Sequence, residues 1–409
     1  MSLILPFKGL RPKPEHAEDV VAPPYDVLNT KEARQQASGR PHSFLHISKP
    51  EIDLPEGTNP FADAVYAKGA ENLKKLVDAE ILIRDPKPRY YVYQLIMGQH
   101  TQVGLVAAAS VADYDTNRIR KHEFTRPEKE DDRVNQIDAL NAQTGPVFLT
   151  YKNDTQVDLI ISNVCKTKPE YDLTAADGVR HTIWVMDEQQ SIDEITRLFD
   201  NMDCLYIADG HHRSAAASRV AAKRKEQGLD AGMQDYFLSV MFPDNQMQIL
   251  DYNRVVVDLN NLSNEAFLEK VSERFAMTES NDPVKPAQAE SFGMYLNKQW
   301  YSLTIKPEFK SDDPVGRLDV SLLHDNLIEP VLGIADPRRD KRVDFVGGIR
   351  GLAELEKRVD CGEMQVAFSF YPTSMADLMA VADANEVMPP KSTWFEPKLA
   401  DGLVSHVLD

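Results

Sequence analysis

The chain has 409 residues, of which 42% are hydrophobic and 27% are charged, and its formal net charge is −18. This composition is typical of a soluble globular protein with two or three domains. The negative charge speaks against a nucleic-acid surface, because binding to phosphates requires Lys and Arg clustered over a wide face.

Neither a secretory nor a membrane pattern is present in the sequence. The cysteines Cys165, Cys204 and Cys361 are scattered and form no C-x-x-C pair, so no disulfide framework or cysteine zinc site is predicted. The apolar run at the N-terminus is too short for a signal peptide, and the run Val103–Ala112 is about half as long as a membrane span. We therefore expect a cytoplasmic protein with no membrane partner.

The sequence predicts three regions, of which the first is an N-terminal α/β region at residues 1–155. Its polar continuation, residues 152–177, lacks strong periodicity. The predicted elements of this region are a helix at Asn59–Glu80, a strand pair at Arg89–Met97 and Gln102–Val111, a helix at Arg133–Ala142 and a strand at Pro146–Tyr151.

The central region, residues 156–250, alternates strands and helices, which predicts a sheet with helices packed on it and ligands at the carboxyl ends of strands. The region 251–409 is predicted to be a second α/β lobe with a KSTWF tail. The predicted central elements are strands at His181–Met186, Cys204–Ala208 and Tyr236–Phe242 and helices at Ile192–Met202 and His211–Gln227.

The segment CLYIADGHHRSAAASR, residues 204–219, passes from an apolar strand through Asp209 and Gly210 into an alanine-rich helix. A helix start presents unpaired backbone N–H groups and the positive end of the helix dipole, so this turn is a candidate site for phosphate or carboxylate. The alternative is a structural turn, in which Asp209 caps the helix and Gly210 makes the bend. Because His211, His212 and Arg213 contribute nothing to a cap, we favour the functional interpretation.

Two further segments carry groups that bind anions. One is the basic window 118–133, for which an exposed loop laced with ion pairs is the alternative. The other is the tail MPPKSTWFEPK, residues 388–398, for which an ordinary C-terminal turn is the alternative. The candidate phosphate ligands of these segments are Arg120, Lys121, His122, Thr125, Arg133, Lys391, Ser392 and Thr393.

Several familiar site types do not fit the spacing. The pair His122-Glu123 lacks the second histidine of a zincin, and the adjacent His211 and His212 point about 100° apart on a helix, so they cannot chelate one zinc ion. No G-x-S-x-G nucleophile elbow occurs, the segment 347–351 lacks the dinucleotide-binding spacing, and the tail lacks the glycines of a Walker A loop.

Five motifs stand out together: PPYDV at 23–27, KHEFT at 121–125 with the downstream Asp132-Arg133, GPVFLTY at 145–151, ADGHHR at 208–213 and MPPKSTWFEPK at 388–398. Nearly end to end, the chain resembles a bacterial and archaeal family catalogued as a domain of unknown function. Its ADGHHR element is also similar to the D-G-x-H-R signature of the ParB and sulfiredoxin superfamily, which includes a free serine kinase that uses ADP and partition proteins that bind CTP. Those proteins usually have one histidine before the arginine, whereas this chain has two.

The element pattern predicts an α/β (mixed α+β) fold, and the resemblance implies a ParB-like strand–turn–helix core with an additional α/β lobe. The resemblance also implies phosphate or nucleotide handling at the turn. Relatives are often encoded beside serine-biosynthesis enzymes, which makes phosphoserine or serine the first candidate substrate. The negative charge and the missing helix-turn-helix signal disfavour a partition role.

The leading hypothesis is a phosphotransferase or phosphatase acting on a small phosphorylated metabolite. Arg213 and the backbone N–H groups from Gly210 to His212 would hold the phosphate, with Lys121 and Lys391 completing the charge clamp. The alternatives are a nucleotide-binding regulatory protein without turnover and a structural protein. A Mg²⁺ ion or a nucleotide is the cofactor considered, and the oligomeric state is left open.

Four residues are candidates for the chemistry itself. His211 or His212 would be the general acid/base or the nucleophile, because an imidazole titrates near neutral pH. Glu123 is the alternative base. Asp209 repels a phosphate, so it should cap the helix, bind Mg²⁺ or act as a base.

Overall fold

The computed structural model describes residues 2–409, which form two compact units. The first unit runs to Met247 and also includes Pro397–Asp409, and the second is Gln248–Glu396. The fold is of the mixed α+β class, as predicted. The expected regions 1–155 and 156–250 share one sheet of the first unit, and the last residues of the expected region 251–409 also belong to that unit.

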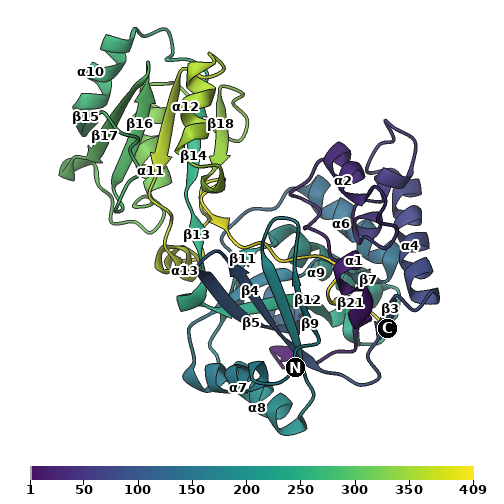
Figure 1. Ribbon diagram of the computed structural model, residues 1–409. Helices are drawn as coiled ribbons and strands as arrows, with labels where there is room; N and C mark the ends of the chain where they lie inside the picture. The colour runs from purple at the N-terminus through teal and green to yellow at the C-terminus, as the bar shows by residue number, and fades with distance from the viewer. Residues whose placement is uncertain (1) are drawn as a thin grey trace. The chain divides into compact units, whose positions relative to one another are not determined.

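A nine-stranded mixed sheet forms the centre of the first unit (Figure 1). Its strands are β1 (Ile4–Leu5), β4 (Tyr90–Met97), β5 (His100–Ser110), β6 (Ile119–Arg120), β8 (Val147–Tyr151), β9 (Tyr171–Thr174), β10 (Arg180–Met186), β11 (Leu205–Asp209) and β12 (Tyr236–Pro243). The order is β6-β11-β8-β12-β5-β4-β10-β9, with β1 paired to β5. Strand β11 lies parallel to β6 and antiparallel to β8, so its carboxyl end meets the start of β8.

The helices of the first unit are α1 (Ala17–Val20), α2 (Thr30–Ala37), α3 (Leu45–Ser48), α4 (Asp63–Asp78), α5 (Val111–Asp115), α6 (Pro127–Leu140), α7 (Thr155–Cys165), α8 (Gln189–Asp200) and α9 (His211–Glu226). Helices α5, α7, α8 and α9 share one core cluster with alternate residues of β5, namely Leu105, Ala107 and Ala109. Helix α9 also packs through Ala216 and Val220 against α6. The alanine-rich helix is therefore fixed on both sides, which holds its first turn in place.

Helices α6 and α7 differ from the sequence expectation. Helix α6 begins at Pro127 rather than at Arg133, because a proline is well suited to the first turn of a helix. Helix α7 lies in the segment expected to lack periodicity. Its N-cap Asp154 accepts from two backbone N–H groups, and Val157, Ile160, Ile161 and Val164 have helical spacing and pack in one core cluster, so the expectation was wrong.

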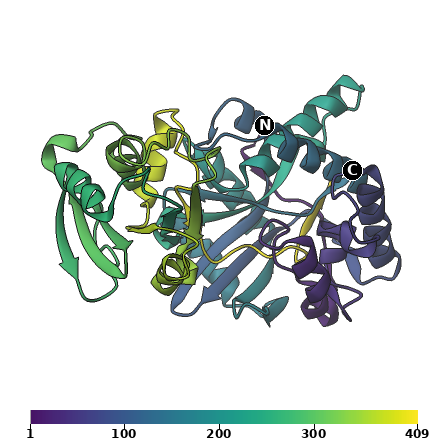
Figure 2. The ribbon, with the colours of Figure 1, turned by 90° about the horizontal axis from the view of Figure 1, so that it is seen from above.

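A four-stranded sheet joins the two ends of the chain. It consists of β3 (Leu82–Arg84), β2 (Gly9–Pro12), β21 (Ser405–Val407) and β7 (Ala142–Gln143), in that order. Figure 2 shows the yellow C-terminal segment running beside the purple N-terminal elements. The backbones of Ala22 and Asp401 exchange two hydrogen bonds, of 3.1 and 2.9 Å. This pairing brings the PPYDV segment against the end of the chain.

The second unit is built on a six-stranded antiparallel sheet of order β15-β17-β16-β19-β14-β18. Helix α12 covers it through Leu355, which packs with Val255, Tyr295 and Ala367. Among residues 2–409, no helix combines the length and the apolar character that crossing a membrane requires. The elements of this unit are β13 (Ile249–Leu250), β14 (Tyr252–Val256), α10 (Asn264–Arg274), β15 (Phe275–Ser280), β16 (Ser291–Leu296), β17 (Gln299–Ile305), α11 (Asp319–Leu323), β18 (Val343–Gly347), α12 (Leu352–Asp360), β19 (Val366–Phe370), α13 (Met375–Asp383) and β20 (Trp394–Phe395).

Candidate functional site

The turn between β11 and α9 is made by Gly210, whose φ of 100° and ψ of 26° lie in the left-handed region. A Cβ atom at this position would lie 3.0 Å from Nε of Arg213. Gly210 is itself the N-cap residue of α9 and has no side chain with which to accept from the first turn. No side chain at the N-cap therefore occupies the first N–H groups of α9. An anion-binding helix start requires such unoccupied N–H groups.

Asp209 directs its carboxylate at cations rather than at the helix cap. Its Oδ2 lies 3.2 Å from Nζ of Lys398, and its Oδ1 lies 3.8 Å from Nη2 of Arg213. Burial opposes ionisation of Asp209, but the charges of Lys398 and Arg213 outweigh it and hold the pKa of this carboxyl below its ordinary value. Asp209 is thus an ionised group that holds two cations at the turn.

The two histidines of the turn hold the loop at residues 121–126. Nε2 of His211 accepts from the backbone N–H of His122 at 3.4 Å, and Nε2 of His212 accepts from the backbone N–H of Arg126 at 3.1 Å. Nδ1 of His211 lies 3.7 Å from Oε2 of Glu123. With Nε2 accepting, a neutral His211 carries its proton on Nδ1, where it faces this carboxylate.

Burial keeps the imidazoles of His122 and His211 neutral. It lowers the pKa of His122 to about 4, and the pKa of His211 falls well below its ordinary value, with His122 adding to the effect. The two rings meet edge to face, with centroids 4.5 Å apart. Within residues 2–409, Nδ1 of His122 is buried and has no hydrogen-bond partner. The pair therefore offers a buried acceptor nitrogen rather than a positive charge.

A second set of residues surrounds Arg213, which donates to the carbonyl oxygen of Pro146. Its side chain borders a cavity of about 30 Å³ that is also lined by Tyr25, Arg133, Gly145 and Asp401. A cavity of this size has room for about two water molecules. Four of the motifs found in the sequence, together with the C-terminal segment, thus meet at one small polar cavity.

Asp401 is the group in this cavity whose ionisation is most perturbed. It is 2% exposed, and its Oδ1 has no hydrogen-bond partner among the described residues. Burial raises its pKa to about 7, although the charge of Arg213 opposes the change. A buried carboxyl that titrates near neutral pH beside arginines is suited to proton transfer.

Arg133 reaches the same cavity through α6 and is held by two neighbours. Its Nη2 lies 2.6 Å from Oδ2 of Asp132, and its guanidinium carbon lies 3.9 Å from the centroid of the Tyr25 ring. The hydroxyl of Tyr66 donates to the other carboxylate oxygen of Asp132 at 2.9 Å. This arrangement fixes the guanidinium without covering all of its donors with carboxylate oxygens.

Other predicted ligands of the first unit make contacts of their own. The ammonium of Lys121 lies 3.9 Å from the centroid of the Tyr114 ring, and burial lowers its pKa. The guanidinium of Arg120 lies 5.7 Å from the centroid of the Tyr206 ring. The hydroxyl of Thr125 donates to Glu130.

The predicted ligands Lys391, Ser392 and Thr393 belong to the second unit. Nζ of Lys391 lies 5.5 Å from the centroid of the Tyr252 ring, and the hydroxyl of Ser392 donates to the carbonyl oxygen of Pro389 at 2.6 Å. Their part in a phosphate clamp stays a prediction.

Three residues of the site were missed by reasoning from the sequence. Tyr25 and Lys398 stand inside motifs that the resemblance marked, PPYDV and MPPKSTWFEPK, and those motifs were the available signal. Asp401 follows Lys398 closely but carries no local signal, because its environment is created by the pairing with Ala22 and by Arg213.

A larger cavity of about 590 Å³ adjoins this site in the first unit. It is lined by Ala22, Pro23 and Pro24 of the PPYDV region and by Lys398 and Ala400 of the C-terminal segment. Its volume is in the range of sites for small organic molecules. Because Lys398 also pairs with Asp209, this cavity lies next to the turn.

Comparison with solved structures found several remote similarities. A free serine kinase mutant in complex with AMP is 12% identical with a TM-score of 0.35, and the match covers 73% of this chain and 92% of that one. SbnI from Staphylococcus aureus, truncated at its C-terminus, is 10% identical with a TM-score of 0.37, covering 72% and 84%. A conserved hypothetical protein from Pyrococcus furiosus is 13% identical with a TM-score of 0.33, covering 75% and 97%. TM-scores of this size support no inference about function.

No curated protein matches the chain. The family model described as "Protein of unknown function (DUF1015)" matches residues 4–321, which is more than half of the sequence. That range includes β11, the DGHHR turn and α9, together with Tyr25 and Arg133. The chain therefore belongs to the DUF1015 family.

Proposed function

We propose that the first unit binds the phosphate group of a small phosphorylated metabolite at the Asp209–Arg213 turn and transfers or hydrolyses that group. The observation that carries this proposal is the meeting of Arg133, Arg213 and Asp401, from three separate segments, at one buried cavity. Phosphoserine or serine is the first substrate to test, and this choice rests on the family resemblance.

Phosphate recognition is assigned to the start of α9 and to the two arginines. The uncapped N–H groups of the first turn and the dipole of α9 favour an anion, and a guanidinium binds two phosphate oxygens at once. A phosphoryl group is larger than two water molecules, so binding requires the cavity of about 30 Å³ to widen. Arg213 lies against Gly145 and Gly210, where the missing Cβ atoms leave its side chain room to move.

Proton transfer is assigned first to Asp401. Its pKa of about 7 allows it both to accept and to donate a proton at neutral pH. His211, with Nδ1 facing Glu123, is the second candidate. His212 is assigned to positioning, because its Nε2 already accepts from the backbone of Arg126.

Binding of a nucleotide without turnover is the second candidate function. The observation that favours it is the cavity of about 590 Å³ beside Lys398, which is large enough for a drug-sized ligand. Its lining includes Asp19 and Asp177 as well as Arg40, so the charge there is mixed rather than uniformly positive. This mixture suits a ligand that carries charges of both signs.

The two functions are separated by ligand binding and turnover measured on the same variants. Thermal shift with phosphoserine, serine, ADP, ATP and CTP identifies the ligand, since a ligand at 100 times its dissociation constant stabilises a protein by about 2.7 kcal/mol. Phosphate release or transfer is then measured for the wild type and for Asp401→Asn. Binding retained with turnover lost supports the enzyme. Binding by the wild type without turnover supports the regulatory protein, and no response to any ligand contradicts both.

A further inference from the structure

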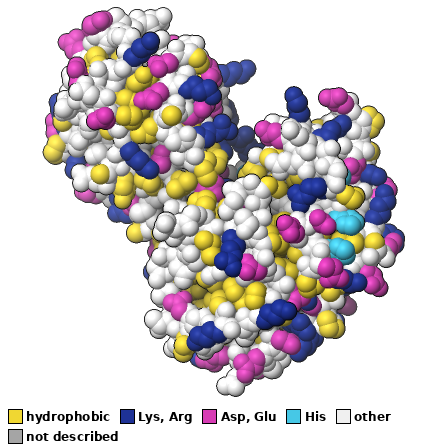
Figure 3. Space-filling view, in the orientation of Figure 1, with side chains coloured by type: hydrophobic (Ala, Val, Ile, Leu, Met, Phe, Trp, Pro, Cys, Tyr) yellow, Lys and Arg dark blue, Asp and Glu magenta, His cyan; other side chains and the backbone are white. Residues whose placement is uncertain are grey.

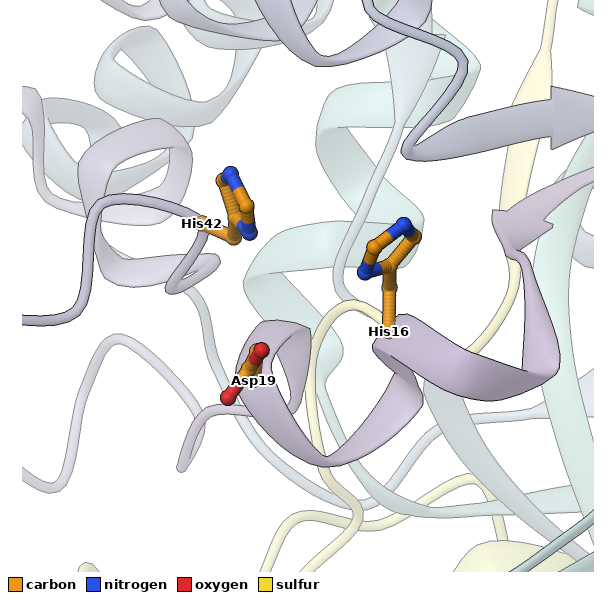
Figure 4. Close-up of side chains that lie close together, drawn as sticks. All are labelled: His16, Asp19 and His42. Atoms are coloured by element: carbon orange, nitrogen blue, oxygen red, sulfur yellow. The ribbon is translucent and has the colours of Figure 1, made fainter.

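His16, Asp19 and His42 form a group of metal-ligating side chains that the proposed function does not use (Figure 4). His16 ends a 3₁₀ turn, Pro14–His16, and is the N-cap residue of α1, whereas Asp19 is the third residue of that helix. Residues three apart lie on the same side of a helical turn. His42 comes from the loop that follows α2, so two separate segments supply the group.

The backbone around these residues is tied together by hydrogen bonds. Nη2 of Arg40 donates to the carbonyl oxygens of Glu18 and Asp19, at 2.8 and 3.3 Å. The N–H of Phe44 donates to the carbonyl oxygen of Val20 at 2.8 Å. The loop that carries His42 is therefore attached to α1 on both sides of the histidine, which fixes the separation of the three side chains.

One donor atom from each residue lies within 4.8 Å of the other two. Figure 4 shows the three side chains around a common space. A tetrahedral ion with bonds of 2.0 to 2.2 Å requires donors about 3.3 to 3.6 Å apart, so donors separated by up to 4.8 Å must approach one another by up to about 1.5 Å. Asp19 is exposed and can supply this movement by rotation.

The three side chains have their donor atoms available. Within residues 2–409, no hydrogen bond or salt bridge engages the side chains of His16, Asp19 and His42, and the two imidazoles meet edge to face with centroids 5.8 Å apart. Figure 3 shows histidine side chains at the surface in the region of α1, with carboxylates beside them. Asp19 is exposed and His16 and His42 are half-buried, so the group is accessible to an ion.

We propose that His16, Asp19 and His42 bind a divalent transition-metal ion of the Zn²⁺ type. Two imidazoles and one carboxylate are ligands that Zn²⁺ accepts, and three protein ligands leave a position open for water or another molecule. Mg²⁺ is not expected, because it prefers oxygen ligands. Asp19 also lines the cavity of about 590 Å³, so the ion would lie at the edge of that cavity and could hold an anionic group of its occupant.

The group in the second unit is a poorer candidate for such an ion. It consists of His324, Asp325 and Glu329, and Nε2 of His324 already lies 3.9 Å from Oε2 of Glu329. It offers a single imidazole, and carboxylates without further nitrogen ligands suit Mg²⁺ or Ca²⁺ better than Zn²⁺.

The test uses the untagged full chain and Co²⁺ as a spectroscopic substitute for Zn²⁺. Visible absorption is followed during titration of the wild type, His16→Gln, His42→Gln and the control His100→Gln, which changes a histidine of β5 outside the group. We expect one equivalent of Co²⁺ to bind with d–d bands that Zn²⁺ abolishes. Affinity should fall at least tenfold in His16→Gln and His42→Gln but not in the control.

Two results would overturn the proposal: no d–d bands in the wild type at saturating Co²⁺, or equal titrations of the wild type and the two variants. Circular dichroism shows whether each variant is folded. Asp19→Asn serves as a further variant, because its side chain is exposed and asparagine has nearly the same shape, and it should also weaken Co²⁺ binding. Unchanged binding by a folded Asp19→Asn would contradict the assigned ligand set.

Discussion

Replacement of Asp401 by Asn should make the protein more stable at alkaline pH, with an effect that grows as pH rises. Burial raises the pKa of Asp401 to about 7 in the folded protein, whereas the ordinary value is 3.8. Between these values the folded chain binds a proton that the unfolded chain has lost, so the free energy of unfolding falls as pH rises. Asparagine resembles the protonated carboxyl and does not titrate. The free energy of unfolding of the variant therefore lacks this fall with rising pH.

The magnitude follows from the shift in pKa. A shift of about three units at 1.36 kcal/mol per unit amounts to about 4 kcal/mol, present in full only above pH 7. Part of this cost already exists at pH 5, where an unfolded aspartate is ionised. Between pH 5 and pH 8 the difference in stability between Asp401→Asn and the wild type should therefore increase by about 2.5 kcal/mol.

Urea denaturation of both proteins at pH 5, 6, 7 and 8 measures this difference. Other titrating groups, including the buried histidines, affect both proteins equally and cancel. A difference that stays constant over this pH range would refute the assignment of a raised pKa to Asp401. A constant difference is the result expected if Arg213 and Arg133 outweigh burial and keep the carboxylate ionised in the folded protein, because both states would then be ionised between pH 5 and pH 8.

Three other predictions follow from the geometry of the turn. Gly210→Ala should lower the free energy of unfolding by about 1 to 3 kcal/mol and weaken phosphate binding. The control Gly178→Ala, with a φ of 84° but open space around it, should lower stability and leave phosphate binding unchanged. Equal phosphate binding by the two variants would count against contact with Arg213. The ring of His122 should titrate near pH 4 by NMR. Because the same ring titrates near 6.5 in the unfolded chain, its contribution to stability is present above pH 6.5 and is lost as pH falls toward 4. A titration midpoint above pH 6 would be inconsistent with burial of the ring. His212→Ala should speed hydrogen exchange at the amide of Arg126 but not at Ala107 in β5, and unchanged exchange would mean that the imidazole does not hold the loop.

Much of the central region could be predicted because its signals are local. Strand β11, the glycine turn and α9 follow from an apolar run, an Asp-Gly pair and an alanine-rich helix that begins where expected, at His211. Helix α7 was missed although Val157, Ile160, Ile161 and Val164 have helical spacing, because the surrounding segment 152–177 is polar in composition.

The site could be predicted only in part, because half of it depends on contacts between distant segments. His211 and Arg213 were visible as chemistry at a helix start, but the sequence could not show that His211 accepts from His122. Asp401 is an ordinary aspartate by sequence, and only its pairing with Ala22 places it beside Arg213. Its altered pKa arises from burial by residues far away in the chain.

The central claim is that Arg213 and the start of α9 bind phosphate, and calorimetric titration with phosphoserine and with inorganic phosphate tests it most directly. The titration compares the wild type with Arg213→Lys and with the control Arg197→Lys on the exposed face of α8, where Arg197 pairs with Glu194. We predict that the wild type and the control bind alike and that Arg213→Lys binds at least tenfold more weakly, because lysine cannot hold two oxygens at once. Equal affinities in all three proteins, or no binding by any of them, would contradict the account.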